Sequence, residues 1–180
     1  VQPDGIRIIK TKGRIKNLDD KIQQEGGLQG TCGIGHTRWA THGAPEIRNT
    51  HPHFSHDTLA IVHNGIIENF EELKKSLINN GYEFESDTDT EVVVHLIHSF
   101  YEGDLFSAFK KAVPLLKGAF AIAVMSKDEP EKLVAVRKGA PLVLGIGEKE
   151  NFVTSDPLAL SDVTDKFIYF DNGDIAEITP

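Results

Sequence analysis

Four residues of this chain could together bind a small zwitterion that also carries an amide. Arg38 has a planar guanidinium that can hold a carboxylate through two parallel hydrogen bonds. Asp89 offers a carboxylate to an ammonium group. Asn64 stands next to Gly65, and an amide NH2 beside a glycine N–H is a suitable donor pair for the oxyanion of a tetrahedral intermediate. These types predict recognition of an amino acid and hydrolysis of its amide.

Further donors lie close to Arg38 in the sequence. The Thr41 hydroxyl and the backbone around His42 and Gly43 can add hydrogen bonds to the same carboxylate. Such a site would reject analogues that lack either charged group, because a buried partner would then be left unpaired.

Each of these residues also has a plainer interpretation. Arg38 alone would be an ordinary surface cation, since isolated surface ion pairs are common and weak. Asn-Gly is typical of a tight turn. Acidic residues such as Asp89 favour a helix N-terminus without any ligand. Only the ordered combination of three segments, residues 36–43, 63–65 and 86–91, favours a site.

The histidines suggest an alternative, a zinc site. Most of them lie between residues 36 and 63. Histidine is a common zinc ligand, but the spacing matches no known ligand signature, and amide hydrolysis by a thiolate needs no metal. We therefore expect no metal and no other cofactor. His95 and His98, three residues apart on a predicted helix, are expected to be solvated or hydrogen-bonded.

The single cysteine, Cys32, is not expected to act as a nucleophile. It lies in a predicted strand over residues 31–38, where its own amine is blocked, and lone buried cysteines are usually inert. On such a strand Cys32 and Arg38 would be about 20 Å apart, too far for one substrate to span.

Composition limits the class of protein. The 180 residues are 39% hydrophobic and 26% charged, which indicates one ordinary globular domain over residues 1–180. A net charge of −8 argues against nucleic acid as a partner. The sequence contains neither a membrane span nor a signal peptide, and one cysteine fits a reducing compartment, so we expect a cytoplasmic location.

Periodicity predicts an α+β fold of layered sheets and helices. Helices are expected to begin near Asn17, as N-cap, and at Asn69, with Glu72 as its capping-box partner, and to run over 90–101 and 104–116. Residues 51–57 are expected to be irregular.

Strands are expected on both sides of this helical block. They are 5–10, 31–38, 59–62, 119–125, 132–136, 142–146, 152–154, 166–170 and 175–178. The strand at 5–10 starts so abruptly that an earlier strand is expected to be missing.

Nearly the whole chain, from about Gly5 to Pro180, resembles the glutaminase domains of the glucosamine-6-phosphate synthases, which are class II glutamine amidotransferases. The resemblance is carried by several ordered motifs. They are His36-Thr37-Arg38-Trp39-Ala40-Thr41-His42-Gly43, His51-Pro52-His53, His63-Asn64-Gly65-Ile66-Ile67-Glu68-Asn69, Ser86-Asp87-Thr88-Asp89-Thr90-Glu91, Lys117-Gly118-Ala119-Phe120 and Ser155-Asp156-Pro157-Leu158-Ala159-Leu160.

The resemblance implies an Ntn-hydrolase fold, a four-layer αββα sandwich, and hydrolysis of glutamine whose ammonia passes to sugar-phosphate isomerase domains. Fructose 6-phosphate would be the acceptor, and the full-length protein would be a homodimer. The implied roles follow by motif. Glutamine would be bound by Arg38, Thr41, His42 and Asp89, the oxyanion hole would be Asn64 and Gly65, Trp39 would lie near the ammonia exit, and His51 would support the site.

The chain departs from that family at its beginning. The family starts with Cys-Gly-Ile, in which the cysteine is the nucleophile and its α-amine the general base. Residue 1 here is Val1. We therefore expect an interior piece of a longer chain that does not hydrolyse glutamine as written. The alternative is a non-catalytic glutamine sensor of the same fold.

Overall fold

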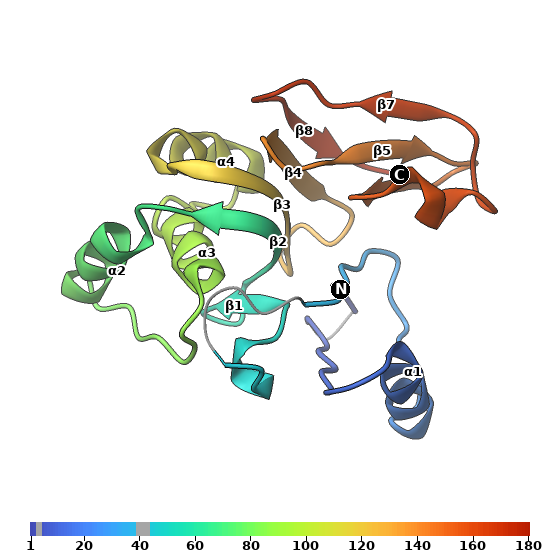
Figure 1. The fold of residues 1–180 in the computed structure, drawn as a ribbon, viewed down its shortest axis with the longest axis horizontal. Coiled ribbons are helices and arrows are strands. Elements are labelled where there is room, and N and C mark those ends of the chain that lie inside the picture. Colours follow the sequence, from blue (N-terminus) through green and yellow to red (C-terminus); the bar gives the residue numbers. More distant parts are fainter. Residues whose placement is uncertain (3–4, 39–43) are drawn as a thin grey trace.

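The computed structural model describes residues 1–2, 5–38 and 44–180. The larger sheet contains five antiparallel strands. They are β1 (His53–Ser55), β2 (Leu59–Ile67), β3 (Gly118–Ser126), β4 (Leu133–Lys138) and β8 (Ile175–Ile178). They lie side by side in the order β1-β2-β3-β4-β8 (Figure 1).

The centre of this sheet is the long pair β2–β3. The two strands pair without interruption from Leu59 opposite Ser126 to Ile67 opposite Gly118. β1 pairs only with Leu59–Ile61, so the edge of β2 from Val62 to Ile67 carries no further strand among the described residues. That open edge borders the cavity described below.

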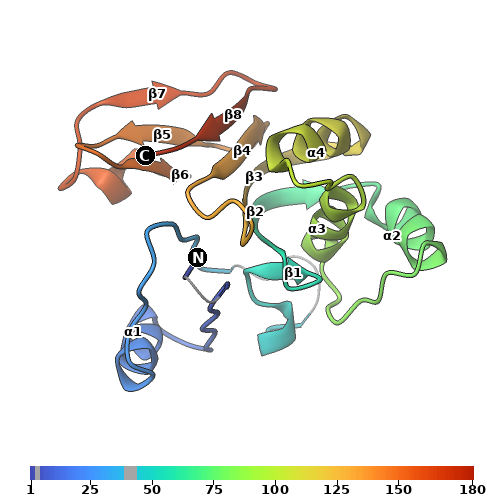
Figure 2. The ribbon, with the colours of Figure 1, turned by 180° about the vertical axis from the view of Figure 1, so that it is seen from behind.

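Three helices cover one face of the larger sheet (Figures 1 and 2). They are α2 (Phe70–Asn79), α3 (Asp89–Ser99) and α4 (Leu105–Ala112). The main core lies between them and the sheet, with Phe109 and Phe120 among its largest fully buried side chains. α3 is the most buried of the helices, and its first turn faces the open edge of β2.

A second, three-stranded sheet packs against the opposite face. Its strands are β5 (Val143–Ile146), β6 (Asn151–Thr154) and β7 (Phe167–Tyr169), in the order β6-β5-β7. A smaller apolar core, including Ala121, Ala135 and Leu142, lies between the two sheets. The short 3-10 helix η3 (Pro157–Leu160) packs on the outer side, where a Cβ on Gly145 would meet Leu160.

The layer order is therefore helices, sheet, sheet and helix, which confirms the predicted α+β sandwich. The outermost layer is thin, because among the described residues it consists of the short helix η3. The remaining helices are α1 (Ile15–Gln24), η1 (Ile47–Asn49) and η2 (Val113–Leu115). α1 has no buried residue and stands apart from the layers (Figure 2). Among the described residues, no helix combines the length and apolar character that crossing a bilayer requires.

Two predicted strands are wrong. Residues 5–10 form only the isolated bridge between Gln2 and Gly5, and residues 31–38 form no strand. Both segments alternate in hydrophobicity, but a strand also needs a partner, and neither segment has one among the described residues. Residues 51–57 differ in the opposite sense, because β1 forms there despite its polar sequence.

The predicted helix starts need two corrections. α1 begins after Arg14 rather than at Asn17, whose side chain instead donates to the Lys12 carbonyl. Asn69 does occupy the N-cap of α2 but makes no capping bond. Its side chain joins α2 to the chain before β3, by donating to Leu115 O and accepting from Lys117 N. A tertiary contact has replaced the predicted capping box.

The other predictions are close. The helices over 90–101 and 104–116 and the six later strands are confirmed within a few residues, and the helix predicted over 104–116 is completed by η2, which contains Pro114. The strand at 59–62 extends to Ile67, so Asn64 and Gly65 lie inside β2 rather than after it.

Glu91 orders the loop that leads into α3. Its carboxylate accepts hydrogen bonds from Glu85 N at 2.8 Å, Ser86 N at 2.7 Å and Ser86 Oγ at 2.6 Å. Thr88 caps the helix by accepting from Glu91 N. His95 Nε2 lies 3.7 Å from Glu91 Oε1. These contacts fix the start of α3, and with it Asp89.

Gly65 allows β2 and β3 to approach. Its φ is +118°, and a Cβ there would lie 2.1 Å from the carbonyl oxygen of Ala119. Gly103 offers a matched comparison, because its φ of +95° is also positive but a Cβ there would meet nothing within 4 Å.

We expect Gly65→Ala to destabilise the protein by at least about 2 kcal/mol more than Gly103→Ala. Both alanines bear backbone strain of about 1–3 kcal/mol, but only the one at position 65 also pushes two central strands apart. Urea unfolding of both variants measures the difference. Equal losses would show that β3 yields to the methyl group at little cost.

Acid should remove the contribution of Glu91. Burial alone would raise the pKa of its carboxyl, but the nearby His95 ring and the hydrogen bonds from Ser86 and from the backbone of Glu85 and Ser86 outweigh burial and lower it to about 2 from 4.5. The unfolded chain therefore takes up the proton first, and stability declines as the pH falls between these values.

The measurement is the free energy of unfolding from pH 7 to pH 2 for the wild type and Glu91→Gln. The gap between them should be constant above about pH 5 and should shrink as the pH falls from 4.5 toward 2. The exposed Glu71→Gln is the control, with no comparable gap expected. A gap independent of pH would contradict this role of the Glu91 charge.

Candidate active site

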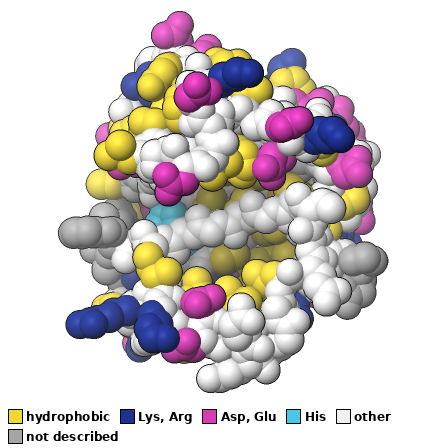
Figure 3. Space-filling model, turned by 90° about the vertical axis from the view of Figure 1, so that its right-hand side faces the viewer, with side chains coloured by type: hydrophobic (Ala, Val, Ile, Leu, Met, Phe, Trp, Pro, Cys, Tyr) yellow, Lys and Arg dark blue, Asp and Glu magenta, His cyan; other side chains and the backbone are white. Residues whose placement is uncertain are grey.

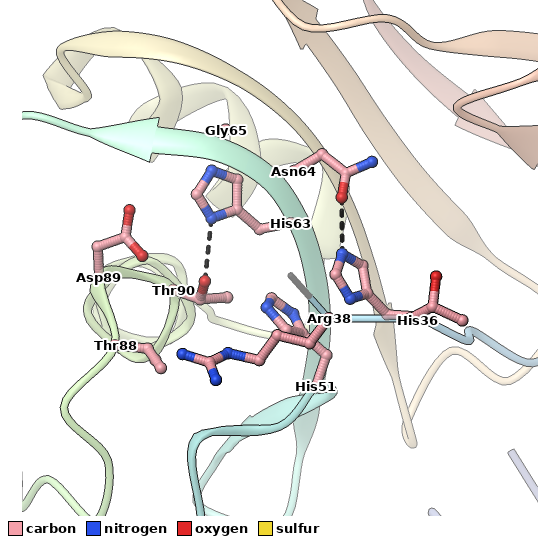
Figure 4. Close-up of a pocket in the computed structure, with 10 residues that line it drawn as sticks. His36, Arg38, His51, His63, Asn64, Gly65, Thr88, Asp89 and Thr90 are labelled. Carbon is pink, nitrogen blue, oxygen red and sulfur yellow. Dashed lines mark hydrogen bonds between the residues drawn. The ribbon is translucent and has the colours of Figure 1, made fainter. Parts of the chain in front are cut away.

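A cavity of about 250 Å³ opens between the edge of β2 and the first turn of α3. The residues that line it come from four segments of the sequence. They are His36, Thr37, Arg38, His51, His63, Asn64, Gly65, Thr88, Asp89 and Thr90 (Figure 4). The structure thus brings Arg38, His51, Asn64, Gly65 and Asp89 to one cavity, and their predicted roles in binding and catalysis stay predictions. Trp39, Thr41 and His42 were also predicted for this site and lie outside the described residues.

Asp89 is anchored at the helix end of the cavity. It is 3% exposed, and its Oδ2 accepts a hydrogen bond of 2.8 Å from Ile67 N on the open edge of β2. Within the described part of the chain, Oδ1 accepts no hydrogen bond. One oxygen therefore holds the carboxylate in place, and the other remains available to a ligand.

Arg38 approaches Asp89 from the other side of the cavity. Figure 4 shows its guanidinium extending toward α3, where Thr88 and Asp89 lie. Nη1 also donates to the carbonyl of Ala44 at 3.3 Å. A cation and a carboxylate thus border the same cavity, which suits a molecule with both charges.

Asn64 is held through its oxygen. His36 Nε2 donates to Asn64 Oδ1 at 2.6 Å, so Nδ2 remains the donor end of the amide. In Figure 4 this Nδ2 points away from Asp89. It faces the junction with a second hollow of about 470 Å³, which shares His36, Thr37, His63 and Asn64 with the first cavity.

That second hollow lies between the two sheets and the N-terminal part of the chain. Its walls include Leu18, Val62, Leu142 and Val153. Figure 3 shows the same face of the molecule hollowed in the middle, with hydrophobic side chains inside and charged side chains around the rim. Asn64 therefore lies at the junction of the two cavities.

The Gly65 backbone also faces the open edge. Along a strand, alternate N–H groups point to the same edge, so Gly65 N–H is expected on the side where Ile67 N–H meets Asp89. A backbone donor and the Asn64 amide are thus adjacent at the cavity wall.

Uncharged histidines support this wall. His51 stacks on His36 with ring centroids 4.0 Å apart and meets His53 edge-on at 5.0 Å. Burial lowers the pKa of His36 and His51, and burial and the charge of Lys10 lower that of His53 to about 3. Because these rings stay neutral near pH 7, His36 can donate one N–H to Asn64 without adding charge beside Arg38.

Five lining residues had no role assigned from sequence, and Thr37 is one of them. His36 and His63 stood inside the quoted motifs, and the signal available was their closeness in sequence to Arg38 and Asn64. Thr88 caps α3, and Thr90 Oγ1 lies 2.9 Å from His63 Nδ1. Their hydroxyls had no distinguishing pattern in the sequence.

The remaining histidines form a separate group behind the cavity. His95 Nδ1 lies 2.8 Å from Ser55 Oγ, and His98 Nδ1 lies 2.9 Å from Tyr82 OH, so both are hydrogen-bonded as expected. Within residues 1–2, 5–38 and 44–180, no group of three or more His, Cys, Asp or Glu side chains is arranged to hold a metal ion.

Cys32 lies away from the lining of the cavity. It is half-buried, and burial raises the pKa of its thiol despite the nearby N-terminal charge. The predicted strand between Cys32 and Arg38 is absent, so the distance expected from strand geometry no longer applies.

Known proteins resemble this chain in sequence and in fold. A family model described as a glutamine amidotransferase domain matches residues 36–162. Glutamine--fructose-6-phosphate aminotransferase [isomerizing] from Bordetella pertussis is 49% identical over 178 residues, covering 96% of this chain and 29% of that protein. The protein of that name from Pseudomonas syringae pv. tomato is 54% identical, covering 94% of this chain and 28% of its own length.

Among solved structures, glutamine phosphoribosylpyrophosphate amidotransferase from B. subtilis matches with a TM-score of 0.67 and 27% identity, over 80% of this chain and 32% of that one. The likeness supports the Ntn-hydrolase type of α+β sandwich. The family model spans more than half of the chain and includes every residue that lines the cavity, so the chain belongs to the glutamine amidotransferase domain family.

Proposed function

We propose that this chain is the glutamine-hydrolysing domain of a longer enzyme that supplies ammonia for making glucosamine 6-phosphate from fructose 6-phosphate. The single observation that carries the proposal is the meeting of Arg38 and Asp89 at one cavity. The acceptor reaction rests on relatives named glutamine--fructose-6-phosphate aminotransferase, of which this chain covers 29%.

The cavity suits glutamine in size and charge. Its volume of about 250 Å³ lies below the roughly 300–1,000 Å³ of pockets for drug-sized ligands. Arg38 grips the α-carboxylate, and the open oxygen of Asp89 accepts from the α-ammonium. Because Asp89 is almost fully buried, a ligand without an ammonium would leave its charge poorly compensated.

The amide end of glutamine then lies toward Asn64. Asn64 Nδ2 and Gly65 N–H are the donors that would stabilise the oxyanion formed when the amide carbon is attacked. A preorganised donor of this kind is worth about 3 kcal/mol of barrier. His36 orients the Asn64 amide, and His51 supports His36 by stacking. Trp39, Thr41 and His42 would complete the site, with Trp39 near the ammonia exit.

The 180 residues contain no N-terminal cysteine that could act as the nucleophile. In the family resembled, it is an N-terminal cysteine whose amine is the base. Residue 1 is Val1, and the one cysteine, Cys32, has a raised thiol pKa, which disfavours the reactive thiolate. We therefore expect the 180-residue chain to bind glutamine weakly and not to hydrolyse it. A glutamine sensor of the same fold is the second candidate.

The wider setting belongs to the same proposal. Residues 1–180 would form one glutaminase domain, working with sugar-phosphate isomerase domains in a cytoplasmic, homodimeric protein. Neither a cofactor nor a nucleic acid takes part. The chemistry is amide hydrolysis by a thiol, which uses only protein groups and water.

Turnover of glutamine tests the function. Glutamate release is measured for the 180-residue chain and for the longest natural protein that contains it. Hydrolysis by a natural form that begins with cysteine, and none by the printed chain, is expected. A natural form without such a cysteine that binds glutamine but releases no glutamate would favour the sensor. Absence of glutamine binding in every form would overturn both candidates.

Arg38→Lys tests the carboxylate clamp in the hydrolysing form. Lysine keeps the charge but cannot make two parallel hydrogen bonds, so KM for glutamine should rise about tenfold or more. Arg7→Lys is the control, because Arg7 is bonded to Glu25 and Gly27 carbonyls near α1 and lines no part of the cavity. Unchanged KM in Arg38→Lys would show that another group holds the carboxylate.

A further inference from the structure

Asn49 is a fully buried polar residue that lines neither cavity. It ends η1, and its side chain is 0% exposed. Nδ2 donates to the Ala44 carbonyl at 3.1 Å and lies 3.3 Å from Asp87 Oδ2, while Oδ1 accepts from Asp87 N at 2.9 Å. One amide therefore joins residue 44 to residue 87.

Ala44 and Asp87 are each connected to one of the two charged residues of the site. Ala44 O also accepts from Arg38 Nη1, so Asn49 and Arg38 share one carbonyl. Asp87 lies two residues before Asp89, at the entrance to α3. Asn49 thus links the support of the cation to the support of the carboxylate, although the two are far apart in sequence.

We infer that Asn49 is a positioning residue that sets the separation between Arg38 and Asp89, and thereby the preference for a ligand with an α-ammonium. The inference rests on the proposed binding of glutamine. A ligand held at both ends needs both groups at one spacing, whereas a ligand held only by its carboxylate does not.

The amide suits this place because it is both donor and acceptor. A carboxylate at position 49 could still accept from Asp87 N, but it would face the Ala44 carbonyl and the Asp87 carboxylate with no proton to offer. Two carboxylates and a carbonyl oxygen would then face one another without a proton between them. The contact between residue 49 and the Ala44 carbonyl should therefore break.

Arg48 does not replace this link. Its guanidinium bonds Glu46 Oε2 at 2.8 Å and Asp87 Oδ2 at 2.7 Å, but both contacts are half exposed to solvent. Exposed ion pairs contribute little to fixing a geometry. The buried amide of Asn49 is the contact on which the spacing depends.

The test compares two ligands rather than one. Glutamine carries the α-ammonium, and glutaramate is the same molecule without it. Their dissociation constants are measured by NMR titration on the 180-residue chain. On a natural form that hydrolyses glutamine, KM for glutamine and the inhibition constant of glutaramate take their place. The wild type should prefer glutamine by roughly tenfold or more, because glutaramate leaves Asp89 uncompensated.

Asn49→Asp should reduce this preference to within about threefold, mainly by weakening glutamine. Asn49→Ser is neutral and too short to contact both Ala44 and Asp87, so it should also reduce the preference for glutamine. It replaces Asn49→Asp in the test if that variant does not fold. Asn151→Asp is the matched control, because Asn151 also donates to a carbonyl, that of Thr179, but lies on β6 away from the cavity.

The ratio distinguishes positioning from a general loss of stability. Partial unfolding lowers the apparent affinity for both ligands equally, and leaves the preference at the wild-type value. An unchanged preference in the folded Asn49 variants would overturn the inference while leaving glutamine binding intact. A wild type that does not prefer glutamine over glutaramate would instead overturn the assignment of Asp89, and with it the inference.

Discussion

The hydrogen bond from Ile67 N to the Asp89 carboxylate is the contact on which the cavity depends. It joins the first residue of α3 to the edge of β2, two residues beyond Gly65. The contact brings a buried negative charge to a strand edge whose N–H groups would otherwise lack partners. The helix and the sheet are thereby held at the spacing that leaves the cavity of about 250 Å³ between them.

Uncharged side chains build the rest of the wall. The stacked rings of His36 and His51 place an N–H on Asn64 while adding no charge of their own, because burial keeps both rings neutral. A permanently charged residue at position 36 would compete with Arg38 for a carboxylate ligand or repel it. The cavity therefore keeps its two opposite charges at separate places, as the proposed binding of an amino acid requires.

The sequence predicted the parts that depend on local pattern, and the motifs that line the cavity. The strands after residue 118 and α3 are marked by strong periodicity and clear turns. The N-terminal strands failed because alternation says nothing about whether a partner strand lies alongside. Asn49 could not be found from sequence, because its function comes from joining residues 44 and 87, which only the folded chain brings together.

Gly65 shows how one residue meets two requirements at once. Lack of a Cβ lets β2 and β3 pair closely at this point, and the positive φ is available to glycine without strain. The same position directs its N–H to the open edge beside Asn64, since alternate groups on β2 share that edge with Ile67. A side chain here would obstruct the central pair of strands and disturb the backbone donor together. The packing of the sheet and the chemistry of the cavity therefore select the same residue, so the site is built into the central strand pair rather than added to a finished fold.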